Sequence, residues 1–183
     1  MTDGLQQAAR PTTTGRVQAL WLRPASRAPL RAVPQATARP GGGLDGDHAA
    51  PGKREVTLLD AGAWAAACAE LGRQLDPAAR RANVLVAGLD LATTLGRSLR
   101  IGEVVLDVLG ETRPCELLDD GGRVGLCHSL RPQRRGGVHA RVRHGGTLRV
   151  GDEVSVEPPA LTGAAVPGPA APRLRPPPRV PPP

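Results

Sequence analysis

The chain has 183 residues, and its hydrophobic content of 40% is enough for one domain with a buried core. It contains no run of about 18 apolar residues, so no membrane-spanning helix is expected. Its three cysteines are too few, and odd in number, for a disulfide framework. The net charge of +7 is local, because residues 121–150 hold seven Arg and no acid while the rest of the chain balances. We therefore expect a cytoplasmic protein that meets an anionic partner through one segment.

Both ends of the chain have the composition of tails. Residues 1–14 are small and polar, are expected to be disordered, and show no apolar stretch typical of a secretory signal. Eleven of the 20 prolines lie in the last part of the chain, so residues 157–183 are expected to be an extended, disordered tail. This tail is either a ligand for an aromatic-groove domain or a solvated extension. One domain is therefore predicted over residues 15–156.

Short apolar segments alternate with turn residues between the two tails. In chain order, we expect a strand at 17–22, a Gly-rich loop at 41–48, a strand at 55–59, a helix at 61–71, a helical turn at 77–81, and strands at 84–86, 99–101, 104–109, 138–142 and 147–156. Asp60 is placed to cap the helix and Gly72 to end it. The alternation of strands and helices typical of a Rossmann sheet is absent. The pattern predicts a mainly β fold, a closed or distorted barrel with a few short helices.

Cys115 is the first candidate for chemistry. It follows the strand that ends at Leu109, in the run Arg113-Pro114-Cys115-Glu116, and functional groups gather on loops at strand ends. Arg113 favours the thiolate form of such a cysteine. The thiol could act as a nucleophile, carry a persulfide or bind a soft metal, and the alternative is an inert, partly buried cysteine.

The other two cysteines are weaker candidates. Cys68 lies in the Ala-rich helix, where we expect a packed core thiol. Cys127 and His128 are adjacent, and on a strand they would point to opposite faces, so we expect no dyad. Zinc is not favoured either, because the sequence has no Cys-x-x-Cys pair.

The Arg-rich segment is a second candidate site, for an anion. Arginines 131, 134, 135, 141 and 143 flank Gly136-Gly137. Guanidinium groups bind phosphate through paired hydrogen bonds, and Gly lets backbone amides approach an anion closely. A phosphorylated small ligand, a nucleic acid and a merely solvated basic face are all compatible with the charge. The presence of only two Trp, with no Phe or Tyr to stack on bases, argues against nucleic acid.

Several motifs occur in a fixed order over about 140 residues. They are an opening strand ending in Trp21-Leu22-Arg23-Pro24, a Gly46-Asp47-His48 loop, an Arg81-Ala82-Asn83 segment leading into a strand, the Pro114-Cys115 pair, and a closing hairpin over 138–154. In this order the segments resemble the MOSC domain, the module found at the C-terminus of molybdenum cofactor sulfurases and in stand-alone bacterial proteins.

The resemblance implies a barrel-like fold that binds molybdenum cofactor, a pterin dithiolene with a phosphate. It makes Cys115 the catalytic residue, as the molybdenum ligand or as a persulfide carrier. Many relatives have a second Cys three residues earlier, where this chain has Thr112, so a disulfide or relay between two thiols is excluded. The cofactor is expected to be held by Arg81, Asn83, Thr112, Arg113, Arg134, Arg135 and Arg141.

Three functions follow as hypotheses. The first is an oxidoreductase component that reduces N-hydroxylated (N–O) small molecules at a Cys-ligated molybdenum, with separate electron-donor proteins because no flavin, haem or iron–sulfur segment is present. The second is a non-catalytic carrier of sulfur, as a persulfide from a sulfur donor, or of the cofactor itself. The third and least favoured is a basic nucleic-acid-binding module. Pyridoxal phosphate is not expected, because the aminotransferase-like domain that binds it in full sulfurases is missing.

Overall fold

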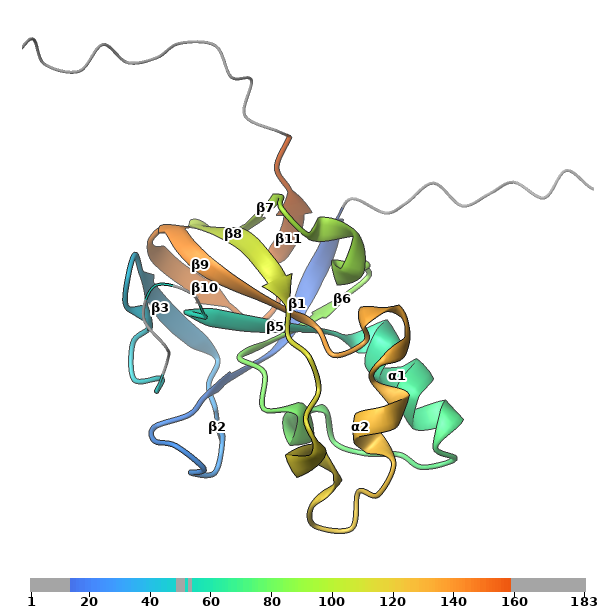
Figure 1. Ribbon diagram of the computed structural model, residues 1–183. Helices are drawn as coiled ribbons and strands as arrows, with labels where there is room; N and C mark the ends of the chain where they lie inside the picture. The colour runs from blue at the N-terminus through green and yellow to red at the C-terminus, as the bar shows by residue number, and fades with distance from the viewer. Residues whose placement is uncertain (1–13, 49–51, 53, 159–183) are drawn as a thin grey trace, which may run out of the picture.

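The structure, a computed structural model, describes residues 14–48, 52 and 54–158 (Figure 1). Its strands are β1 (Thr14–Leu22), β2 (Arg31–Ala32), β3 (Gln35–Arg39), β4 (Gly43–Leu44), β5 (Val56–Asp60), β6 (Val84–Ala87), β7 (Ser98–Ile101), β8 (Val104–Glu111), β9 (Val138–His144), β10 (Gly146–Arg149) and β11 (Glu153–Val156). Its helices are α1 (Ala61–Glu70) and α2 (Leu126–Ser129), with short 3-10 helices η1 (Pro77–Arg80), η2 (Leu91–Thr94), η3 (Glu116–Asp119) and η4 (Pro132–Arg134). The proposed tails lie outside the described residues, apart from Thr14, which begins β1, and Glu157 and Pro158.

Seven strands close into a barrel, as the sequence predicted. They follow one another in the order β11-β7-β8-β9-β5-β6-β1, and β1 pairs with β11 to complete the ring. All neighbouring pairs are antiparallel except β5 and β6, which are parallel. Closure leaves no free edge in the ring, and the inward side chains form one apolar core.

The parallel pair β5 and β6 is joined through α1, so the fold contains one βαβ unit that the sequence pattern did not indicate. A parallel pair requires such a crossover because the chain must return to the starting end of the sheet. As predicted, Asp60 caps α1: its Oδ1 accepts hydrogen bonds from the backbone N–H groups of Gly62 (2.7 Å) and Ala63 (3.1 Å). The helix ends one residue earlier than expected, and Gly72 follows with φ +63°.

Replacing Asp60 with Ala is expected to lower the free energy of unfolding by about 1 kcal/mol, because two N-terminal N–H groups of α1 lose their acceptor. Urea denaturation followed by circular dichroism measures this change. Asp60→Ser keeps an acceptor at the same position and serves as the control. Equal losses in the two variants would show that the cap contributes nothing.

Helices α1 and α2 cover one outer side of the barrel, where Figure 1 shows them next to each other. Their apolar residues and those on the outer face of the nearby strands form a second core, which includes Trp21, Leu59, Leu85 and Leu126. Cys68 belongs to this core and is 2% exposed, in agreement with the prediction of a packed thiol.

The closing hairpin expected over 138–154 does not form, and this prediction was wrong. The expected strand at 147–156 is divided into β10, which pairs with β3, and β11, which pairs with β1 and β7. A turn separates them, in which Gly151 has φ +94° and the backbone N–H of Arg149 donates to Asp152 Oδ2 at 2.7 Å. Strands β10, β3 and β4 form a separate small sheet beside the barrel.

Cys127 lies on helix α2 and not on a strand, so the reason given above for excluding a Cys127–His128 dyad was wrong. The thiol is 3% exposed and packs in the second core, whereas His128 is exposed. Among the described residues, no helix is long and apolar enough to cross a membrane. The same residues contain no group of three or more His, Cys, Asp or Glu side chains placed to hold a metal ion.

Candidate functional site

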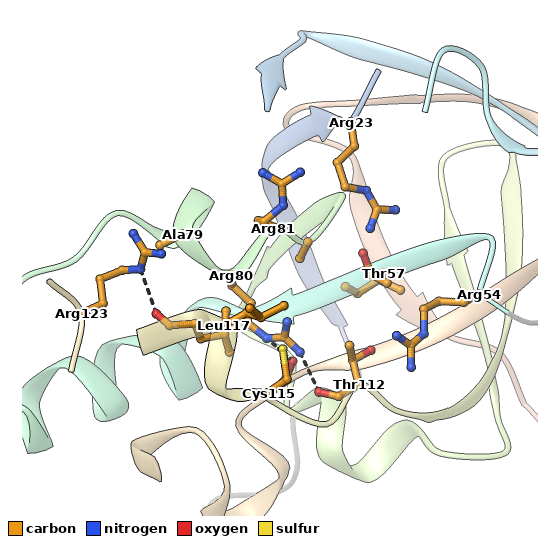
Figure 2. Close-up of a pocket in the computed structure, with 14 residues that line it drawn as sticks. Arg23, Arg54, Thr57, Ala79, Arg80, Arg81, Thr112, Cys115, Leu117 and Arg123 are labelled. Atoms are coloured by element: carbon orange, nitrogen blue, oxygen red, sulfur yellow. Dashed lines mark hydrogen bonds between the residues drawn. The ribbon is translucent and has the colours of Figure 1, made fainter. Parts of the chain in front are cut away.

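A cavity of about 210 Å³ lies on the outside of the barrel, where the ends of several strands meet the short helices (Figure 2). The parallel pairing of β5 and β6 brings the starts of both strands to one edge, and the antiparallel β1 ends there. The register carries the end of β8 to the same place, since Glu111 pairs with Val138 and Val138 with Leu58. The residues that line the cavity are Arg23, Arg54, Thr57, Leu58, Ala79, Arg80, Arg81, Ala82, Thr112, Cys115, Leu117, Leu118, Arg123 and Gly136.

Cys115 is the exposed cysteine of the chain, and its thiol is at the wall of this cavity. The residue precedes η3, with extended backbone angles, and its carbonyl accepts the N–H of Leu118 at 3.0 Å. The sequence prediction of a thiol on a loop after β8 agrees with this position. An accessible thiol is free to bind a metal or to react, which the buried thiols of Cys68 and Cys127 are not.

Arg80 connects the cavity to the loop that carries Cys115. Its Nη2 donates to the carbonyl of Thr112 at 2.7 Å and its Nε to the carbonyl of Gly136 at 2.9 Å. Burial lowers the pKa of Arg80 to about 10; the nearby Cys115 thiol opposes this shift and the Arg54 guanidinium adds to it. Arg80 is therefore still a cation at neutral pH, and Figure 2 shows it beside Cys115.

Three further arginines line the cavity without an ion pair among the described residues: Arg54, Arg81 and Arg123. The Nη2 of Arg81 donates to the carbonyl of Ala28 at 2.8 Å, and the Nε of Arg123 donates to the carbonyl of Leu118 at 2.9 Å. None of the described residues that line the cavity is a carboxylate, so these residues do not neutralise the positive charge around Cys115.

The fifth arginine, Arg23, is partly neutralised. Its Nη2 lies 2.7 Å from Asp47 Oδ2 in an ion pair whose carboxylate is fully buried. The same nitrogen donates to Asn83 Oδ1 at 3.2 Å. Asp47 comes from the Gly46-Asp47-His48 loop, so this motif fixes one wall of the cavity.

Asn83, a predicted cofactor-binding residue, lies beneath the cavity and does not line it. It is fully buried, and its Oδ1 accepts from the N–H (3.0 Å) and the hydroxyl (2.8 Å) of Thr57 as well as from Arg23. Its Nδ2 donates to the carbonyl of Trp21 at 3.2 Å. These bonds tie β1 and β5 to the start of β6, so Asn83 positions Thr57 and Arg23, which do line the cavity.

Thr112 and Arg113 lie on the segment that leads to Cys115. Thr112 is 8% exposed and lines the cavity, and its buried Oγ1 makes no hydrogen bond with the described residues. Arg113 points to a neighbouring surface cavity that it shares with Glu111, Pro114 and Arg131. Thr112 and Cys115 thus share one cavity wall, and Arg113 lines a different cavity.

The arginines predicted from the basic segment are not in the cavity. Arg135 pairs with Glu70 at 2.5 Å, Arg141 pairs with Asp107 at 3.1 Å, and Arg134 donates to the carbonyl of Ala92 at 3.5 Å. Of that segment, Arg123 and Gly136 reach the wall around Cys115. Sequence reasoning did not single out Arg23, Arg54, Arg80 or Arg123 as site residues, and the available signal was the Arg80-Arg81 pair at the end of the helical turn predicted over 77–81.

The fold and site together define a closed β-barrel protein with an exposed thiol inside a cationic, carboxylate-free cavity. Comparison with protein families matches residues 45–155 to the MOSC domain. This match spans more than half of the chain, and the chain belongs to the MOSC domain family. No relative was found among curated proteins.

Solved structures support the same fold. The YuaD protein from Bacillus subtilis has a TM-score of 0.64 and 18% identity, with 78% of this chain and 95% of that chain covered. YiiM from Escherichia coli has a TM-score of 0.61 and 17% identity, covering 78% and 70%. YiiM from Geobacillus stearothermophilus has a TM-score of 0.59 and 15% identity, covering 83% and 77%.

Proposed function

We propose that this MOSC protein binds molybdenum cofactor in the Cys115 cavity and is an oxidoreductase component that reduces N-hydroxylated small molecules. The observation that supports this most is the exposed thiol of Cys115 beside four arginines that have no ion pair within the described residues. A thiolate is a good donor to a soft metal, and guanidinium groups suit the phosphate of the pterin.

The residues of the cavity fit this cofactor in their chemistry. Cys115 would supply the metal ligand, and Arg80, on which both the Cys115 thiol and the Arg54 guanidinium act electrostatically, would be a cation beside it. The Oγ1 of Thr112 is buried on the wall and has no hydrogen-bond partner among the described residues. Buried polar groups usually have a partner, and a bound ligand would supply one here. When bound, the cofactor supplies two-electron oxygen-transfer chemistry at molybdenum.

The chain itself contributes position and charge. Arg80 holds the Thr112 carbonyl and the Gly136 carbonyl together, which fixes the loop on which Cys115 lies. The arginines of the wall favour an anionic ligand and disfavour a cationic one, because the described part of the wall contains no carboxylate. Reduction of an N–O bond consumes two electrons and two protons, so a separate electron-donor protein is part of the proposal.

Molybdenum content tests the proposal directly. Protein purified from a cofactor-competent host is expected to hold close to one molybdenum per chain, and Cys115→Ser is expected to hold less than about a tenth of that, because a hydroxyl is a poor ligand for this metal. Cys68→Ala, which changes a buried thiol of the second core, is the matched control and is expected to keep its metal. Low metal in the wild type that is unchanged in Cys115→Ser would refute the proposal.

A sulfur carrier is the second candidate, and the isolation of the exposed thiol favours it. Cys68 and Cys127 are buried, and Thr112 stands near Cys115, so no neighbouring exposed thiol would resolve a persulfide. In this reaction the Cys115 thiolate attacks the outer sulfur of a donor persulfide, a new S–S bond forms, and the donor leaves as a thiol. A mass gain of one sulfur on Cys115 without reductase activity would favour this function over the first.

A further inference from the structure

A second cavity, of about 310 Å³, lies next to the Cys115 cavity. The two share Arg81, Leu117 and Arg123 as lining residues, and the second cavity adds Arg27 and Asp120. We call this second space the outer cavity. Because three residues belong to both walls, a small molecule in the outer cavity can extend into the space beside Cys115.

The outer cavity has an excess of positive charge. Arg27, Arg81 and Arg123 form no ion pair with the described residues, and the side chains of Arg81 and Arg123 donate to backbone carbonyls. Asp120 is the one carboxylate among the residues that line it. Three guanidinium groups against one carboxylate leave a local charge of the sign that an anionic group requires.

Backbone strain falls on two of these arginines. Arg27 has φ +61° and Arg81 has φ +59°, in the left-handed region where a residue with a side chain costs free energy that Gly would avoid. The Arg81 Nη2 bond to the Ala28 carbonyl ties the two strained turns together. Strained residues persist where the surrounding structure holds them and gather at ligand-binding sites.

We propose that the outer cavity binds the phosphate group of a phosphorylated small-molecule substrate, whose reacting group lies beside Cys115. The term substrate rests on the function proposed above. Forked guanidinium groups suit the oxygens of a phosphate. Leu117, which is 64% exposed and lies on the wall shared by both cavities, offers an apolar contact for the body of the molecule between its two ends.

This phosphate site is distinct from the arginines nearest the thiol. Arg54 and Arg80 interact electrostatically with each other, and Arg80 with Cys115, and neither lines the outer cavity. Figure 2 shows Arg80 beside Cys115, Arg54 farther away past Thr112, and Arg123 on the opposite side beyond Leu117. In this proposal Arg54 and Arg80 serve the cofactor phosphate and Arg27 serves the substrate phosphate, whereas Arg81 and Arg123 line both cavities.

The test titrates inorganic phosphate into ¹⁵N-labelled, cofactor-free protein at constant ionic strength, with chloride as the balancing anion. The side-chain Nε–H signals of Arg81 and Arg123 are expected to move along a saturable curve. Arg123→Gln and Arg27→Gly are each expected to weaken that binding at least fivefold, whereas Arg149→Gln, at the exposed last residue of β10, leaves it unchanged. Arg27→Gly is also expected to raise the urea midpoint, because it relieves the strained φ.

Two results would overturn the inference: no saturation with phosphate beyond the effect of chloride, or equal phosphate binding in Arg123→Gln and the wild type. If Arg123→Gln does weaken phosphate binding, its molybdenum content shows whether the outer cavity is a substrate site or the site of the cofactor phosphate. Wild-type metal with lost phosphate binding supports a substrate site, and a parallel loss of metal would show that the outer cavity holds the cofactor phosphate instead. Absence of metal in the wild type, with phosphate binding intact, would refute the proposed function and leave the phosphate site standing.

Discussion

Replacing Asn83 with Ala is expected to lower the free energy of unfolding by about 3 to 5 kcal/mol, because several buried polar groups lose their partners at once. The Thr57 N–H, the Thr57 hydroxyl and the Trp21 carbonyl all bond to the Asn83 side chain, which is fully buried. Each buried group left without a partner costs about 1–3 kcal/mol.

Urea denaturation of Asn83→Ala measures this loss as a lower midpoint. The matched control is Asp45→Asn, which removes charge from an exposed ion pair with Arg39 and is expected to leave the midpoint almost unchanged. A midpoint for Asn83→Ala equal to that of the control would contradict the structural role. Asn83→Ala also frees Arg23 and Thr57, so any folded fraction is expected to hold less molybdenum than the wild type.

The strands of the barrel could be predicted because their apolar residues are large. Residues 55–59 and 104–109 carry Val and Leu on the buried side, and both segments are strands in the structure. Strand β3 was missed because its buried residues, Ala36 and Ala38, are small and give a weak alternating pattern. The division of 147–156 depends on strand partners far away in the sequence, which no local pattern contains.

The loop position of Cys115 could be predicted, but most of the arginines around it could not. The excess of Arg in residues 121–150 is real, yet Arg135 and Arg141 face carboxylates from other parts of the fold, Glu70 and Asp107. Arg54 and Arg80 reach the cavity because parallel pairing puts the starts of β5 and β6 at one edge. Local sequence shows how many cations a segment has, and strand topology decides which of them remain without a partner.

Gly137→Ala is expected to prevent stable folding, with a loss of about 4 kcal/mol or more, out of a total that is about 5–15 kcal/mol for a domain. A Cβ at this position would collide with the carbonyl oxygen of Leu58, which belongs to the β5 backbone and cannot move aside. Gly137 also has φ +87°, and its carbonyl accepts the N–H of Thr112 at 2.8 Å. The glycine therefore allows the loop before β9 to lie against both β5 and the segment that leads to Cys115.

Gly151→Ala is the control that separates two effects at Gly137, the collision of a Cβ with Leu58 and the strain of a positive φ. Gly151 has φ +94°, and a Cβ added there meets nothing within 4 Å, so its substitution is expected to cost only about 1–2 kcal/mol. Soluble yield and the urea midpoint of the two variants provide the comparison. Similar losses would mean that φ alone requires Gly at position 137. A far larger loss for Gly137→Ala would show that close backbone contact with Leu58 keeps Thr112, and with it the Cys115 loop, in place.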